Sequence, residues 1–198
     1  MAEPIAIGRL LRAGTSGFVA GCRVDQLDGP AFGALVRAPL GVAYQVFGLI
    51  HDIRIDDDGL VRQLVTAEAV SDEVMLDNRE RRIVPVELSV LAVGYEQEGS
   101  IHHLLPPRPP LSLDRLYLCD DEDIKRFASV GHFGYFRHVL AARELPMGEL
   151  LAAHFRQVLR AQNDGGAWRD AAIQELIALL RADYASLTPI LGALNEVV

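Results

Sequence analysis

Residues 7–24, IGRLLRAGTSGFVAGCRV, contain the pattern that decides the fold of the first half of the chain. From residue 18 to residue 24 successive side chains alternate with a period of two, which is the period of a β-strand. The small and polar residues AGTSG at 13–17 come directly before this run and supply a turn. The stretch therefore predicts a strand that belongs to a hairpin.

Similar short apolar runs continue along the chain and are separated by turn residues. Residues 31–39, AFGALVRAP, are followed by residues 41–55, GVAYQVFGLIHDIRI, and an acidic turn at 56–59 ends the second run. Alternation returns at 84–90, where Pro85 indicates an edge position or a bulge because proline cannot donate to a strand ladder. Several short strands at close intervals favour a small closed barrel over a sandwich, and closure would also remove the strand edges.

A proline-rich segment, LLPPRPP, occupies residues 104–110. Its prolines fix the backbone φ angle at successive positions and remove N–H donors, so we expect a stiff, extended connector. The alternative is a ligand for a proline-binding module.

Beyond the connector the apolar period becomes that of helices. Asp120 or Asp121 can cap a first helix, and Pro146 is well placed in the first turn of a later one. The clearest amphipathic helix is predicted from a stripe at steps of three and four, made of Ile173, Leu176, Ile177, Leu180 and Tyr184. A last short helix is expected to begin at Ser186 or Thr188.

These patterns predict an α+β protein, with a small closed β-barrel at the N-terminus followed by a C-terminal α-helical domain. We place the barrel domain at residues 1–103, the proline-rich connector at 104–118 and the helical domain at 119–198.

Composition and charge exclude several classes of protein. The net charge of −8 disfavours broad binding of nucleic acid by this chain alone, because such binding depends on neutralising phosphates with Lys and Arg. Arg79, Arg81 and Arg82 could form a local basic patch, although a solvated hairpin turn is the simpler interpretation. The N-terminus lacks the pattern of a signal peptide, and the apolar stretch 40–50 is too short to cross a bilayer. We therefore expect a cytoplasmic protein without a membrane span.

Motifs for nucleotides and metals are absent from the sequence. Neither GxxxxGK[ST] nor GxGxxG occurs, and Lys125 has no glycine-rich turn before it, so no nucleotide is expected. No two of the six histidines lie at i and i+4, and Cys22 and Cys119 are far apart, so no metal site is predicted. His51 and Asp52 could form half of a base-and-orienter pair, but no nucleophile turn accompanies them. The sequence assigns no catalytic, cofactor-binding or metal-binding residue.

One family resemblance is carried by residues 7–39 together with residues 44–55, YQVFGLIHDIRI. Its features are Ile7-Gly8 at the start, the strand through Phe18, the apolar pair Leu35-Val36, and a Gly48 that precedes Ile50 and Asp52. This part of the chain resembles the HAS barrel, which opens HerA-type DNA-translocating ATPases and has relatives at the start of ATP synthase catalytic subunits.

The resemblance implies a barrel that takes part in ring assembly and contacts partner proteins such as a NurA-type nuclease. In that family a segment like LLAAHFRQVL, at 150–159, leads into a phosphate-binding loop. Here AQNDGGAW follows at 161–168 and lacks GKS or GKT, which puts ATP hydrolysis and motor activity in doubt.

Three functions are consistent with the sequence. The leading hypothesis is a non-catalytic binding or assembly protein that docks on a protein partner or associates with itself. The first alternative is a hydrolase-like enzyme with a site between barrel and helices, drawing on His51, Asp52 or His102. The second is a barrel that binds single-stranded nucleic acid, which the acidic charge and the sparse aromatic residues disfavour.

Overall fold

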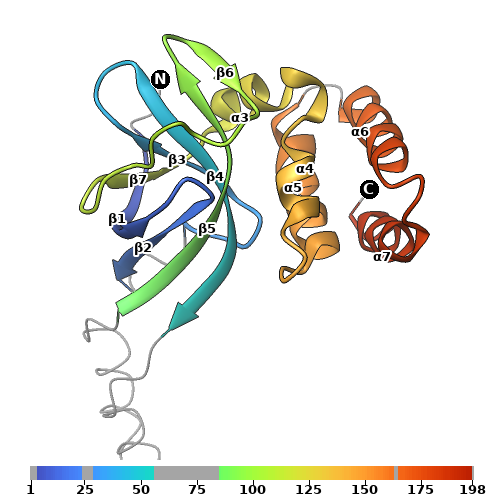
Figure 1. Cartoon of the computed structure of the whole chain (residues 1–198), viewed down its shortest axis with the longest axis horizontal. Helices are drawn as coiled ribbons and strands as arrows, with labels where there is room; N and C mark the ends of the chain where they lie inside the picture. The colour runs from blue at the N-terminus through green and yellow to red at the C-terminus, as the bar shows by residue number, and fades with distance from the viewer. Residues whose placement is uncertain (1–3, 24–28, 56–84, 163–164, 198) are drawn as a thin grey trace, which may run out of the picture.

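The structure is a computed structural model, and it describes residues 4–23, 29–55, 85–162 and 165–197. Within these ranges the strands precede the helices, as the alternating and helical periods predict (Figure 1). No helix in the described ranges is long and apolar enough to span a bilayer.

Six antiparallel strands close into a barrel. The strands of the sheet are β1 (Ala6–Ala13), β2 (Gly17–Arg23), β3 (Leu35–Pro39), β4 (Tyr44–Ile55), β5 (Pro85–Gln97), β6 (Ser100–His102) and β7 (Arg115–Leu118). Their order is β2-β1-β7-β3-β4-β5-β6, and an additional pairing between β2 and β5 closes the cylinder. The short β6 extends the sheet beside the end of β5. The predicted α+β class, with an N-terminal closed barrel and a helical region after it, is confirmed.

Two details of the strands differ from the sequence predictions. Strand β7, at the end of the segment placed in the connector, is a barrel strand between β1 and β3. Its pairing is not visible in sequence, because four residues after a proline-rich segment carry too little alternation to stand out. Pro85 is the first residue of β5, and β5 pairs on both sides, so the predicted edge position is wrong. The first residue of a strand is another place where proline is tolerated.

The interior of the barrel is filled by alternate side chains of its strands. Its buried members include Ile7, Leu10, Phe18, Val36, Tyr44, Val46, Ile50, Val86, Leu88, Val90 and Leu116. Gly48 lies where β4 packs tightly against β5. A Cβ atom at Gly48 would clash with the Val90 side chain and lie 2.9 Å from the carbonyl oxygen of Leu91.

The barrel shares a second core with the helices. Leu35, Phe47, Leu49 and Val93 project from the outer face of the barrel into the helical cluster. Val93 is an extra residue in β5, because Phe47 pairs with Gly94 while Gly48 pairs with Ala92. Ala92 faces the barrel interior and Val93 faces the helices, as successive residues of a strand do, so one strand serves both cores.

The helical region consists of one short 3₁₀ turn, η2 (Gly131–Phe133), and five α-helices in the described ranges. These helices are α3 (Asp121–Ala128), α4 (Phe136–Ala141), α5 (Met147–Ala161), α6 (Gly165–Leu179) and α7 (Tyr184–Asn195). Helices α4 and α5 lie between the barrel and the outer pair α6 and α7 (Figure 1). The Gln157 side-chain oxygen on α5 accepts a hydrogen bond from the backbone N–H of Leu35 at 2.9 Å, which fixes α5 to β3.

The sequence predicted the positions of the helices more accurately than the residues at which they begin and end. Asp120 caps α3 as expected, with its carboxylate accepting from the N–H of Asp123. The predicted stripe is wrong at Tyr184, because α6 ends at Leu179 and Tyr184 begins α7. Asp183, rather than Ser186 or Thr188, caps α7, since its carboxylate accepts from both the N–H and the hydroxyl of Ser186.

A ring of polar side chains ties α3 to the barrel. Arg37 Nε donates to Asp123 Oδ2 at 2.9 Å, and Arg126 Nη2 donates to Glu96 Oε1 at 2.6 Å. Gln45 closes the ring by donating to Glu96 and accepting from Arg37, while Arg126 also lies 3.9 Å from Asp123. Burial raises the pKa of Asp123, and Arg37 opposes that shift. We therefore interpret this cluster as a structural clamp.

Candidate functional site

A partly exposed ionisable side chain at the boundary between barrel and helices belongs to His51 on β4. Ile50 pairs with Val90 and Asp52 pairs with Ser89, so His51 is an extra residue without a partner on β5. A bulge of this kind changes the direction of a side chain, and bulges are common beside functional sites. The His51 imidazole lines two hollows on the outside of the barrel.

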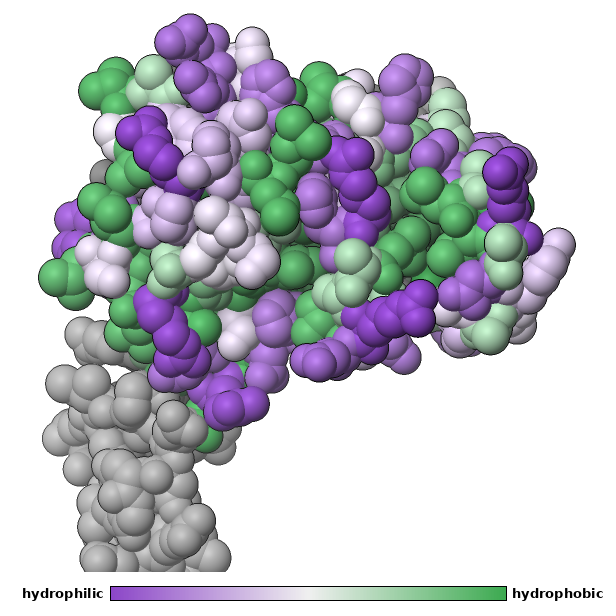
Figure 2. Space-filling model, in the orientation of Figure 1, coloured by the Kyte–Doolittle hydropathy of each residue, from purple (hydrophilic) through white to green (hydrophobic). Residues whose placement is uncertain are grey.

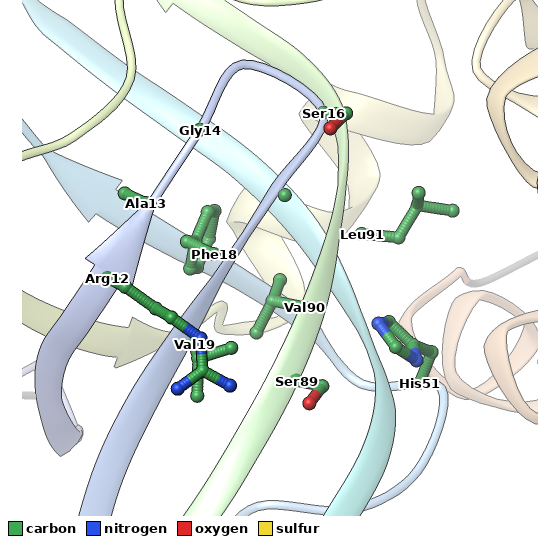
Figure 3. Close-up of a pocket in the computed structure, with 11 residues that line it drawn as sticks. Arg12, Ala13, Gly14, Ser16, Phe18, Val19, His51, Ser89, Val90 and Leu91 are labelled. Atoms are coloured by element: carbon green, nitrogen blue, oxygen red, sulfur yellow. The ribbon is translucent and has the colours of Figure 1, made fainter.

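The first hollow, of about 400 Å³, lies along the β1–β2 hairpin and strand β5 (Figure 3). Its polar side chains come from four segments: Arg12 on β1, Ser16 in the hairpin turn, Ser89 on β5 and His51 on β4. Arg12 Nη2 also lies 3.5 Å from Glu87 Oε2. These groups lie on an open barrel surface, which suits reversible contact better than enclosure of a substrate.

The second hollow, of about 580 Å³, lies between β4 and the segment that joins α4 to α5. His51 and Asp52 line it from the barrel, while Glu144, Leu145 and Pro146 line it from the helical side. This is the boundary at which the enzyme hypothesis placed a site. His102 does not belong to it, because its ring stacks on Tyr95 with centroids 4.9 Å apart.

The surroundings of His51 in this hollow shift the pKa of its imidazole. Burial lowers the pKa of His51, and the neighbouring Asp52 partly offsets that shift, so the imidazole is neutral at pH 7 and can accept a proton. Asp52 Oδ2 lies 3.3 Å from Arg54 Nη2. Among the described residues no other side chain forms a hydrogen bond with the His51 imidazole, and Ser89 is therefore not arranged as an activated nucleophile.

A second group of ionisable side chains is sealed inside the protein. The hydroxyl of Tyr135 and Nε2 of His154 are 3.1 Å apart, and His103 Nε2 lies 3.0 Å from the carbonyl oxygen of Phe127. Because a carbonyl only accepts, His103 Nε2 carries the proton. Burial lowers the pKa of both histidines to about 4 and raises the pKa of Tyr135. All three groups are neutral at pH 7, and their burial makes them part of the core.

Two side chains of α4 contact the backbone carbonyl oxygen of His103. His138 Nε2 lies 3.2 Å from this oxygen, and Arg137 Nη2 donates to it at 2.5 Å. His102 is exposed, whereas His103 is buried. The turn Gly131–Phe133 packs against His103, and all three of its residues have positive φ. No sequence pattern indicated the unusual conformation of His132 and Phe133.

The remaining candidates carry no site. In the described ranges no group of three or more His, Cys, Asp or Glu side chains could hold a metal ion. Cys22 and Cys119 are both buried, and burial raises the pKa of the Cys119 thiol. The residues considered for a basic patch, Arg79, Arg81 and Arg82, and the acidic turn at 56–58 lie outside the described residues.

No family model matches the chain, and no curated protein matches it. A small closed barrel is shared by many unrelated proteins, so the observed fold does not by itself identify a HAS barrel. The HAS-barrel interpretation is therefore a proposal that depends on residues 7–55.

Proposed function

We propose that this protein is a non-catalytic binding or assembly protein, in which a HAS-like barrel and an outer pair of helices dock on a protein partner or on a second copy. The observation that carries the proposal is the apolar character of the solvent-facing sides of α6 and α7. A helix at the surface of a protein that binds nothing there normally has a polar outer face.

Helix α6 buries Trp168, Ala172 and Leu176 toward the rest of the helical region. On its other sides Ile177 is 37% exposed and Leu179 is 45% exposed. Helix α7 buries Leu187, Ile190 and Leu194, while Tyr184 at its start is 72% exposed. We call the exposed apolar residues Ile177, Leu179 and Tyr184 the outer helical surface; Ile177 and Leu179 are two positions apart and point to different sides of the end of α6. Figure 2 shows hydrophobic residues gathered over the helical region on the face in view.

The barrel also supports the proposal that this protein binds a partner. In the described ranges the six barrel strands are paired on both sides, and the unpaired strand edge belongs to the three-residue β6, so we expect contacts to be made mainly by side chains. The resemblance to HAS barrels, which assemble rings and contact partners such as a NurA-type nuclease, is consistent with that mode. No nucleotide is needed for it.

Size-exclusion chromatography with light scattering, together with a pull-down from native lysate, tests the proposal. We expect the full chain to elute with a mass above that of one chain or to retain a partner. Ile177→Glu should abolish that association, because a charge cannot be buried in an apolar interface without a partner. Ala167→Glu is the matched control, since Ala167 is an exposed residue in the first turn of the same helix, about 15 Å along the axis from Ile177. A strictly monomeric protein with no retained partner would contradict the proposal.

An acid–base enzyme is the second candidate. The observation that favours it is the bulge that directs His51, neutral at pH 7, into a hollow shared with Asp52 and Glu144. A panel of hydrolase assays should then show turnover that His51→Ala abolishes and His132→Asn, an exposed control, leaves unchanged. Absence of turnover by the natural protein rejects this candidate.

A further inference from the structure

Two arginines face each other on neighbouring barrel strands. Arg9 on β1 and Arg115 on β7 are direct partners in the antiparallel ladder, and both are exposed. Like charges directly opposite each other in a sheet are destabilising. Arg9 Nη1 donates to the carbonyl oxygen of Leu113 at 2.9 Å. In the part of the chain that the structure describes, neither arginine forms an ion pair with a carboxylate.

Exposed leucines lie beside these arginines. Leu11 is an extra residue in β1, between the pairs Leu10 with Ala20 and Arg12 with Val19. Its methyl groups lie over Gly21, which is the partner of Arg9 on β2, so Leu11 is close to the arginine pair. Its side chain is about half exposed.

Leu113 lies in the turn that enters β7 and is 70% exposed. Its φ angle is 72°, which a leucine rarely adopts, and the turn is held against β1 by a hydrogen bond from the Leu113 N–H to the carbonyl oxygen of Leu10 at 2.8 Å. Leu111 in the same turn is also exposed. The fold therefore holds apolar side chains out to solvent beside Arg9 and Arg115. We call Arg9, Leu11, Leu111, Leu113 and Arg115 the arginine–leucine face.

The charge of this face is opposite to that of the whole chain, which is −8. Two described carboxylates lie near it, and both have other partners. Asp114 Oδ2 accepts from the N–H of Leu111 at 2.9 Å, and Glu87 lies 3.5 Å from Arg12. Arg9 and Arg115 are thus left to meet an external anion.

We infer that the arginine–leucine face binds a segment of a partner protein that carries carboxylates beside leucine-like side chains. This inference rests on the proposed function as a binding protein and names the chemistry of one partner. Carboxylates would relieve the repulsion between the paired arginines through charge-assisted hydrogen bonds. Leu11, Leu111 and Leu113 would bury apolar area against the same segment.

Two other anionic partners fit less well. A nucleic-acid backbone supplies phosphates but offers nothing for three exposed leucines to contact. An anionic membrane fits less well, because a pair of arginines is smaller than the basic clusters that bind such membranes. A carboxylate-bearing apolar peptide matches both the charges and the leucines.

Fluorescence anisotropy of the full chain with a labelled synthetic helical peptide of Glu and Leu tests the inference. The matched probe has Gln in place of every Glu. We expect tighter binding of the Glu/Leu peptide, with an affinity that falls as salt is added. Arg115→Glu should weaken binding about tenfold, because one attractive contact becomes repulsive.

Arg115→Glu also separates loss of binding from loss of folding. A glutamate at this position would pair with Arg9 across the ladder, so the melting temperature should be kept or raised while affinity falls. Arg181→Glu, at an exposed position after α6, is the matched charge control and should bind like the natural protein. Leu113→Gly, which removes the side chain and suits a positive φ angle, should fold and bind weakly.

The inference is overturned if Arg115→Glu binds as the natural protein does, if the Gln/Leu peptide binds equally well, or if phosphatidylserine vesicles bind more tightly than the peptide. The proposed function would not be contradicted by any of these results, provided that light scattering still shows association and that Ile177→Glu abolishes it. A strictly monomeric chain that nevertheless binds the Glu/Leu peptide would reject the outer helical surface and keep the arginine–leucine face.

Discussion

Acid should destabilise this protein through its two buried histidines, and the effect can be measured one residue at a time. His103 and His154 have a pKa of about 4 in the folded protein because burial disfavours the charged imidazole, whereas an exposed histidine has a pKa near 6.5. Between these values the unfolded chain binds protons that the folded protein does not. The contribution to stability is therefore fully present above pH 6.5 and is lost as the pH falls toward 4.

The size of the effect follows from the two pKa values. For one such histidine, the free energy of unfolding falls by about 2 kcal/mol between pH 7 and pH 5. Other groups titrate over the same range, so the informative quantity is the difference between the natural protein and a variant that lacks one buried imidazole. His154→Gln is suitable, because a glutamine oxygen can still accept from the Tyr135 hydroxyl.

Urea unfolding of both proteins at pH 7, 6 and 5, followed by circular dichroism, gives these free energies. The natural protein should lose about 2 kcal/mol more than His154→Gln over this range. Any loss of unfolding free energy that the substitution causes equally at every pH does not affect the result, because each protein at pH 5 is compared with the same protein at pH 7. His132→Asn, at an exposed position, should follow the natural protein. Parallel pH dependence of the natural protein and His154→Gln would refute the reasoning.

Two further substitutions test the packing. Gly48→Ala should cost about 1–3 kcal/mol of unfolding free energy by overpacking the barrel. Gly192→Ala in α7 has open space around it and should raise the free energy of unfolding by about 0.5–1 kcal/mol. Urea midpoints measure both effects, and equal midpoints would contradict the packing argument. Arg37→Ala should lower the melting temperature by several degrees, because it leaves the largely buried carboxylate of Asp123 without its main partner. The exposed Arg54→Ala serves as its control, and an equal loss in both would show that the polar ring is no clamp.

The sequence predicted those features that depend on local patterns. Alternation at residues 18–24 gave a barrel strand, and the acidic residues after Cys119 gave a helix capped by Asp120. Strand β7 was missed because its place between β1 and β3 depends on how the whole barrel closes. The same is true of the bulges at His51 and Val93, since a bulge is a mismatch between two strands and neither strand shows it alone.

The candidate surfaces also combine residues that the sequence could indicate with residues that only the fold brings together. His51 and Asp52 could be named from sequence as a possible acid–base pair, but Glu144 could not, because the α4–α5 connection reaches β4 only in the folded protein. The pairing of Arg9 with Arg115 joins residues more than a hundred positions apart in the chain. Tyr184 was predicted to be on the buried stripe of its helix, but it is exposed because α6 ends before it.

Sedimentation velocity of the full chain, alone and with any protein that copurifies with it, tests the central claim most directly. The account predicts that the natural protein sediments faster than a single chain and that Leu179→Glu, on the outer helical surface, restores the single-chain rate. The Ala167→Glu control should sediment like the natural protein. Single-chain sedimentation of the natural protein at every concentration, with no copurifying protein, would contradict the claim that it acts by binding and assembly.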